Sequence, residues 1–150
     1  MKLRALTAVT FSLAAATLLG AASAQPAASE DKSATYCRIR VHGGILAKYI
    51  VLGSDKGRLG CPIGTEQMAA GGGGRVQEFD GATIYWSQAT DAHPVSGRIL
   101  DLFQKNRGEL GCAGYPIDDE SDTPDGRGRY QHFQHGTIWH WKNGKVSVVC

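Results

Sequence analysis

The sequence lacks both a charge excess and long apolar segments, and each deficit excludes a class of partner. Sixteen lysines and arginines stand against 14 aspartates and glutamates in 150 residues. Lys2 and Arg4 lie in an N-terminal leader, so the rest of the chain is balanced. Nucleic acids and anionic membranes attract clustered cations, which such a mixed surface does not provide. Beyond residue 24 no apolar run is long enough to cross a membrane. We therefore expect neither partner.

Motifs of common catalytic and metal sites are also missing. There is no Gly-x-Ser-x-Gly elbow, and the glycines at 71–74 do not stand between a strand and a helix as a phosphate loop would. The acidic run at 118–122 does not match a calcium-binding loop. His132 and His135 flank an expected hairpin turn and need not converge with His140 on zinc. We expect no metal, no cofactor and no catalytic residue.

The N-terminus has the pattern of a secretory signal peptide. Lys2 and Arg4 are followed by an apolar run over residues 5–20 and by small residues at 22–24. We predict that residues 1–24 are cleaved, and the lack of a cysteine at that point argues against a lipid anchor. Residues 25–35 are rich in alanine, serine and charge without periodicity, which predicts a disordered N-terminal arm.

What the chain does contain is one segment twice. Residues 129–139 resemble residues 75–85, and Phe133 follows Phe79 by 54 positions. The same offset, without gaps, pairs residues along nearly the whole segment from 41 to 149. Self-similarity of this kind marks a tandem-repeat architecture, in which each unit needs neighbours to bury its apolar face. We predict a single domain over residues 36–150, with a first unit at about 41–94 and a second at about 95–148.

Each unit predicts a short helix, a Gly/Pro turn and a β-hairpin. Apolar residues at helical spacing open the units: Ile45, Leu46 and Tyr49, then Ile99, Leu100 and Phe103. Turns with glycine and proline follow at 59–62 and 113–116. Residues 75–86 and 129–140 alternate as hairpin strands, with Ile84 and Ile138 on the core face. The predicted fold class is an α+β, β-dominated tandem repeat with propeller-like packing, braced by disulfides.

All four cysteines follow the leader: Cys37, Cys61, Cys112 and Cys150. An even number in an exported chain predicts two disulfides rather than metal ligands or a catalytic thiol. Three connectivities are open, and the sequence does not choose among them. We favour Cys37–Cys150, which would tie the ends of the array, together with Cys61–Cys112, which would join corresponding turns.

Several separated segments resemble the LGFP repeat. They are Leu59-Gly60-Cys61-Pro62 with the following Glu66, Arg75-x-Gln77-x-Phe79, Thr83-Ile84-Tyr85-Trp86 and the opening residues 43–49. The likeness covers roughly residues 41–149 and includes both units. It implies an exported actinobacterial protein that associates with the cell envelope, and it implies binding to polysaccharide.

Four hairpin aromatics are candidates for stacking on sugar rings: Tyr85, Trp86, Trp139 and Trp141. A flat rigid ring covers the C–H face of a sugar and loses little entropy on binding. The alternative is that these aromatics fill the core between the units. Trp141 is the strongest candidate, because Ser87 occupies the corresponding place in the first unit.

Glu66 and Glu120 recur at matching positions and could accept hydrogen bonds from sugar hydroxyls. Alternatively, each could hold backbone N–H groups of its own turn, or pair with Arg75 or Arg129. A glycosidase would need two carboxyl groups about 5–10 Å apart, and the sequence does not establish such a separation.

The sequence therefore predicts a secreted, monomeric, non-catalytic module that attaches to cell-wall polysaccharide of the arabinan or galactan type. Two alternatives stay open. One is a small secreted protein-binding or inhibitory protein on the same scaffold, and the other is a cell-wall hydrolase. No residue of the chain identifies a ligand. The choice among these three functions therefore depends on how the candidate side chains are arranged.

Overall fold

The computed structural model describes residues 32–150. The predicted signal peptide at 1–24 lies outside the described residues, and so does the segment 25–31 of the predicted arm. The end of that arm is ordered, because β1 (Ser33–Tyr36) pairs antiparallel with β2 (Ile39–His42). The prediction of disorder up to residue 35 is therefore wrong for residues 33–35. Pairing with β2 supplies the order that this segment's own composition does not.

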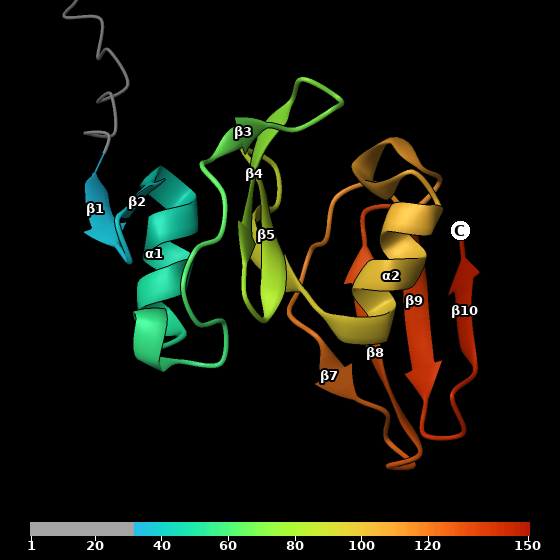
Figure 1. Cartoon of the computed structure of the whole chain (residues 1–150). Coiled ribbons are helices and arrows are strands. Elements are labelled where there is room, and N and C mark those ends of the chain that lie inside the picture. The colour runs from blue at the N-terminus through green and yellow to red at the C-terminus, as the bar shows by residue number, and fades with distance from the viewer. Residues whose placement is uncertain (1–31) are drawn as a thin grey trace, which may run out of the picture.

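Most of the regular secondary structure in the described chain consists of short strands (Figure 1). After the first pair these are β3 (Gln67–Met68), β4 (Gly74–Phe79), β5 (Ala82–Ser87), β6 (Asp91–Val95), β7 (Ser121–Asp122), β8 (Gly128–Phe133), β9 (Gly136–Trp141) and β10 (Val146–Val149). The helices are α1 (Gly43–Val51) and α2 (Gly97–Lys105), with 3-10 turns η1 (Ser54–Lys56) and η2 (Gly108–Leu110). Within residues 32–150, neither α-helix has the length and apolar character needed to span a membrane.

The strands form a β1–β2 hairpin and two four-stranded antiparallel sheets. The first sheet has the order β3-β4-β5-β6 and the second the order β10-β9-β8-β7. Their hairpins have the same register, since Gln77 pairs with Ile84 and Gln131 with Ile138. The predicted repetition of helix, turn and hairpin is confirmed.

The layers follow one another along the molecule (Figure 1). Helix α1 contacts both the β1–β2 hairpin and the first sheet, and α2 contacts strands of both sheets. The hairpin lies at one end in Figure 1 and the C-terminus at the other. Propeller-like packing is not confirmed, because helices and sheets alternate in the described chain.

Each helix fills a core of its own. In the first, Tyr49 of α1 packs against Phe79 with ring centroids 4.6 Å apart. In the second, Phe103 of α2 packs against Phe133 with centroids 4.8 Å apart. Ile84 and Ile138 are fully buried in these two cores, as predicted from the alternation of the strands.

The β1–β2 hairpin covers α1 in the way that the first sheet covers α2. Tyr36 lies edge-on to Tyr49, with centroids 5.0 Å apart and planes at 88°. Tyr85 lies edge-on to Phe103, with corresponding values of 5.1 Å and 89°. The N-terminal hairpin therefore substitutes for a preceding sheet and closes that end of the stack.

Two buried glutamines connect the layers. Gln77 Nε2 donates to the carbonyls of Arg40 and Gly64 at 3.0 and 2.9 Å. Gln131 Nε2 donates to the carbonyls of Pro94 and Asp118 at 3.0 and 2.8 Å. Because Pro94 belongs to β6, the second glutamine joins the second sheet to the first.

Two disulfides are present, but their connectivity corrects the prediction. The bonds join Cys37 to Cys61 and Cys112 to Cys150, with Cα separations of 5.9 and 5.8 Å. A disulfide needs Cα atoms within about 7 Å. The β1–β2 hairpin, which holds Cys37, and the C-terminus lie at opposite ends of the stack in Figure 1, so Cys37 and Cys150 cannot meet. Each bond instead ties a terminal strand segment to the turn of its nearest unit.

Candidate functional site

Tyr85 is part of the core between the units. Only 6% of the residue is exposed, and its ring packs against Phe103 of α2. Burial raises the pKa of its hydroxyl to about 12. This corrects the expectation that Tyr85 belongs to a ligand-binding face, because α2 of the second unit covers that face.

Trp139 occupies the corresponding position of the second sheet, on a face that α2 does not cover. Helix α2 packs on the opposite face, where Ile138 is buried. Trp139 and Trp141 are half-buried, and their rings are nearly parallel, with centroids 6.4 Å apart and planes at 16°. We call this pair the tryptophan face.

The uncovered face is more aromatic than its counterpart in the first sheet. At the offset of 54, Val76 becomes Tyr130, Tyr85 becomes Trp139 and Ser87 becomes Trp141. Val76 and Tyr85 both pack in the second core. The second unit therefore carries larger rings where the first carries helix-contacting side chains.

A hollow of about 430 Å³ adjoins Trp141, and its lining is otherwise polar: Asp125, Arg127, Lys142 and Asn143. Asp125 accepts a hydrogen bond from Thr123 at 2.6 Å and forms an ion pair with Arg127 at 2.8 Å. These contacts, with Thr123 contributing most, hold the pKa of Asp125 well below its usual range. Lys145 Nζ lies 5.9 Å from the centroid of the Trp141 ring. Charged groups thus surround one aromatic surface.

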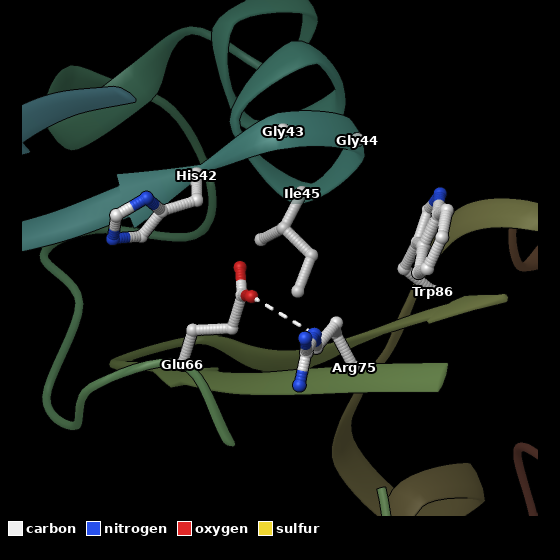
Figure 2. A pocket seen from close by; sticks show the side chains of 7 residues that line it. All are labelled: His42, Gly43, Gly44, Ile45, Glu66, Arg75 and Trp86. Carbon is white, nitrogen blue, oxygen red and sulfur yellow. Dashed lines mark ion pairs between the residues drawn. The ribbon is translucent and has the colours of Figure 1, made fainter. Parts of the chain in front are cut away.

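Trp86 lines a different hollow, of about 230 Å³, at the start of α1 (Figure 2). Its lining residues define the Trp86 pocket: His42, Gly43, Gly44, Ile45, Glu66, Arg75 and Trp86. A Cβ atom on Gly44 would lie 2.5 Å from Cδ1 and Nε1 of the indole. Glycine at this position is what lets the indole lie against the helix.

The two glutamates pair with arginines, which confirms the predicted pairing with Arg75 and Arg129. Glu66 lies 3.6 Å from Nε of Arg75, and Glu120 lies 3.3 Å from Nε of Arg129. The Glu120 side chain is only 7% exposed and also accepts a 2.7 Å hydrogen bond from Ser96. The Glu66 side chain is 19% exposed and lines the Trp86 pocket.

The structure brings together two predicted site residues that the sequence kept apart, Glu66 and Trp86. Arg75, His42 and Gly44 join them without having been predicted as site residues. A signal for the pocket was present in the repeat itself. Gly44 and Trp86 are both replaced in the second unit, by Arg98 and His140.

Asp119 of the acidic run links the two units. Its carboxylate accepts hydrogen bonds from Lys48 of α1 at 2.9 and 3.1 Å, and Nδ1 of His93 lies 2.7 Å away. Burial opposes ionisation of Asp119, but the contacts with His93 and Lys48 outweigh it and lower the pKa of the carboxyl.

The other charged groups near this run are also engaged in pairs. His132 pairs with Asp118 at 2.6 Å. In residues 32–150, no cluster of three or more His, Cys, Asp or Glu side chains has the arrangement of a metal site.

The sequence profile of the LGFP repeat matches residues 59–111 and 114–149, which together are more than half of the chain. This protein belongs to the LGFP repeat family. The first match runs from a Gly/Pro turn through the first sheet and α2, so it contains both Tyr85 and Phe103. The second match contains the second sheet but no following helix. A comparison with curated proteins finds no match. LGFP repeats together with two disulfides fit an extracellular or cell-wall protein.

Proposed function

We propose that this LGFP repeat protein is a secreted, non-catalytic module that binds cell-wall polysaccharide through its tryptophan face. The observation that carries the proposal is the arrangement of Trp139 and Trp141. Two nearly parallel rings stand side by side on one strand, on a face that α2 leaves uncovered. Neighbouring rings on one face suit successive residues of a sugar chain, which present repeated C–H surfaces.

The polar hollow beside Trp141 supports the same function. Sugar hydroxyls both donate and accept hydrogen bonds. Asp125 offers acceptor oxygens, while Arg127 and Lys142 offer donors next to the ring. An aromatic surface with a polar rim combines stacking with orientation of the hydroxyls, as small-ligand sites generally do.

The role proposed here is binding rather than hydrolysis. A glycosidase places two carboxyl groups on either side of one glycosidic bond. Glu66 and Glu120 lie in different units, and each pairs with an arginine of its own unit. Glu120 is almost completely buried in that pair. This arrangement favours a structural role for Glu120.

A second candidate is protein binding, and one observation favours it. In the first sheet, the face that corresponds to the tryptophan face receives helix α2. An amphipathic helix with an aromatic side chain, as α2 has in Phe103, would fit against Trp139 in the same way. Substitutions on the tryptophan face should weaken binding in either case. Soluble polysaccharide separates the two candidates, because it displaces only sugar binding.

Sedimentation of the secreted protein with insoluble actinobacterial cell walls tests the proposal. Soluble arabinan or galactan should release the bound protein, whereas dextran should not. Trp141→Ala should weaken binding roughly 5- to 150-fold, judged from base–aromatic stacking at about 1–3 kcal/mol. Val51→Ala is the matched control, since it removes an exposed apolar side chain from α1.

Each outcome decides between the candidates. Release by arabinan or galactan, together with loss in Trp141→Ala, supports polysaccharide binding. Retention that no sugar displaces, but that protease treatment of the walls abolishes, favours protein binding. Absence of any binding to walls contradicts the proposal.

A further inference from the structure

We propose that the Trp86 pocket is a second binding site, which takes a single neutral sugar residue through two neighbouring hydroxyl groups. The inference rests on the proposed polysaccharide function and adds a contact on the first sheet, away from the tryptophan face. The pocket lies where the start of α1 approaches β4 and β5 (Figure 2). Trp86 packs against the edge of the first core, and the second unit has His140 at the corresponding position.

The apolar wall of the pocket is the indole of Trp86. Figure 2 shows this ring on one side of the hollow, with Ile45 between it and Glu66. The side chain is only partly buried, so part of it stays open to solvent. Gly44 removes the Cβ that would otherwise collide with the indole. Trp86 therefore offers apolar ring surface, on which the C–H face of a sugar can pack.

The polar floor of the pocket is the pair formed by Glu66 and Arg75. A carboxylate only accepts hydrogen bonds and a guanidinium only donates them, whereas each hydroxyl does both. The N···O separation of 3.6 Å is longer than a strong charge-assisted hydrogen bond. The Arg75 side chain is half-exposed. Two adjacent hydroxyls can therefore complement the carboxylate, which accepts, and the half-exposed guanidinium, which donates.

The second unit provides an internal comparison, because it keeps the glutamate and the arginine but not the indole. There Glu120 is held by Arg129 at 3.3 Å and by Ser96 at 2.7 Å. His42, Gly44 and Trp86 of the pocket correspond to Ser96, Arg98 and His140. What distinguishes the first unit is the indole of Trp86, with Gly44 beside it.

Size and charge narrow the ligand class. The volume of about 230 Å³ falls below the roughly 300–1,000 Å³ of pockets for drug-sized ligands, so one ring fits. The charges of Glu66 and Arg75 cancel, so the pair gives no net electrostatic preference for a charged sugar. A neutral residue at a chain end or a branch is the expected occupant.

Chemical-shift titration of the ¹⁵N-labelled secreted protein tests this site directly. The probes are methyl α-D-arabinofuranoside, methyl β-D-galactofuranoside and, as the acidic comparison, methyl β-D-glucuronide. At least one neutral glycoside should shift the NMR signals of the Gly44 backbone amide and the Trp86 indole N–H, and the shifts should reach saturation. A Kd in the millimolar range is expected for a ligand of this size.

Three variants separate the pocket from the fold. Trp86→His, which copies the second unit, should weaken the titration roughly 5- to 150-fold. Glu66→Gln keeps the side-chain size and should weaken it about tenfold, because a charged acceptor is lost. His140→Ala changes the equivalent place in the second unit and should leave the shifts of Gly44 unchanged. The wild-type dispersion of amide signals reports that each variant is folded.

The results distinguish failure of this proposal from failure of the proposed function. If the protein sediments with cell walls but neither neutral glycoside shifts Gly44 and Trp86, the pocket proposal is overturned and wall binding stands. If a neutral glycoside binds in the pocket but the protein does not bind cell walls, the pocket proposal is supported and the proposed function fails. Tighter binding of the glucuronide than of both neutral glycosides overturns the assigned ligand class. Unchanged titration in a folded Trp86→His variant also overturns the proposal.

Discussion

Tyr85 of β5 lies edge-on to Phe103 of α2, with ring centroids 5.1 Å apart and planes at 89°. The contact joins the sheet of the first unit to the helix of the second. Trp139 occupies the same strand position in the second sheet, but α2 packs on its opposite side. One position in the repeat is therefore core in the first unit and surface in the second, because the adjacent layer decides which faces are covered.

Substitutions on the two faces of β9 should have opposite effects on stability and binding. Ile138→Ala should lower the free energy of unfolding by about 2–5 kcal/mol, since it leaves a cavity in the second core. Trp141→Ala should cost much less stability, because Ser87 occupies the corresponding position in the first unit. Urea unfolding of the secreted protein, with wall sedimentation in parallel, measures both quantities. Equal loss of stability in the two variants, with unchanged binding per folded molecule, would make Trp141 a core residue.

Removing the glutamine that joins the sheets should loosen the second unit. Gln131→Ala removes the donor to the carbonyl groups of Pro94, which is buried, and Asp118, which is partly buried. Each unsatisfied group costs about 1–3 kcal/mol. Hydrogen exchange should therefore accelerate in β8 and β9 more than in β4 and β5. The matched variant is Gln77→Ala, which should show the reverse pattern, and uniform acceleration in both would contradict separate roles for the two glutamines.

Each disulfide should join a terminal segment to the turn of its nearest unit. Proteolysis under non-reducing conditions should release peptides that join Cys37 to Cys61 and Cys112 to Cys150. The bonded residues are separated by 24 and 38 positions, and loop-closure entropy then predicts about 3–4 kcal/mol of stabilisation for each. Replacing either cysteine pair by serine should therefore lower the Tm, and replacing both pairs should lower it further. A peptide that joins Cys37 to Cys150 would refute the layered arrangement.

The link between the units should depend on pH through Asp119. Its pKa in the folded protein is below the ordinary value of 3.8, so its carboxylate stabilises the fold fully above that pH. The contribution is lost as the pH falls through the lower folded-state pKa. Asp119→Asn should therefore lower stability at neutral pH, by about 0.2–1 kcal/mol because the pair is partly exposed. Thermal unfolding of wild type and variant should converge under strongly acidic conditions.

A control for that titration is Asp122→Asn, since the Asp122 side chain is largely exposed. At neutral pH, Asp122→Asn should lower the stability less than Asp119→Asn does. If Asp119→Asn lowers the Tm by the same amount at neutral and strongly acidic pH, its effect does not come from the ionised carboxylate.

Much of the local structure was predictable from the repeat. A gapless offset means that both units have the same turn residues and the same alternation, so residues 75–86 and 129–140 form the same hairpin. Alternation also placed Ile84 and Ile138 in the core. The number of disulfides followed from the cysteine count, and pairing of each glutamate with an arginine was one of two alternatives. All of these depend on neighbours along the chain or on composition.

The tertiary structure decided which faces are covered and which cysteines meet. Tyr85 is buried because α2, a helix of the next unit, packs on it, and no local pattern in β5 specifies that contact. The favoured pairing of Cys37 with Cys150 failed because the layers stack in a line, which separates the ends. The Trp86 pocket likewise depends on how closely α1 approaches β5. Burial and proximity of this kind depend on the order of the layers in space. The sequence periodicity within one unit does not specify that order.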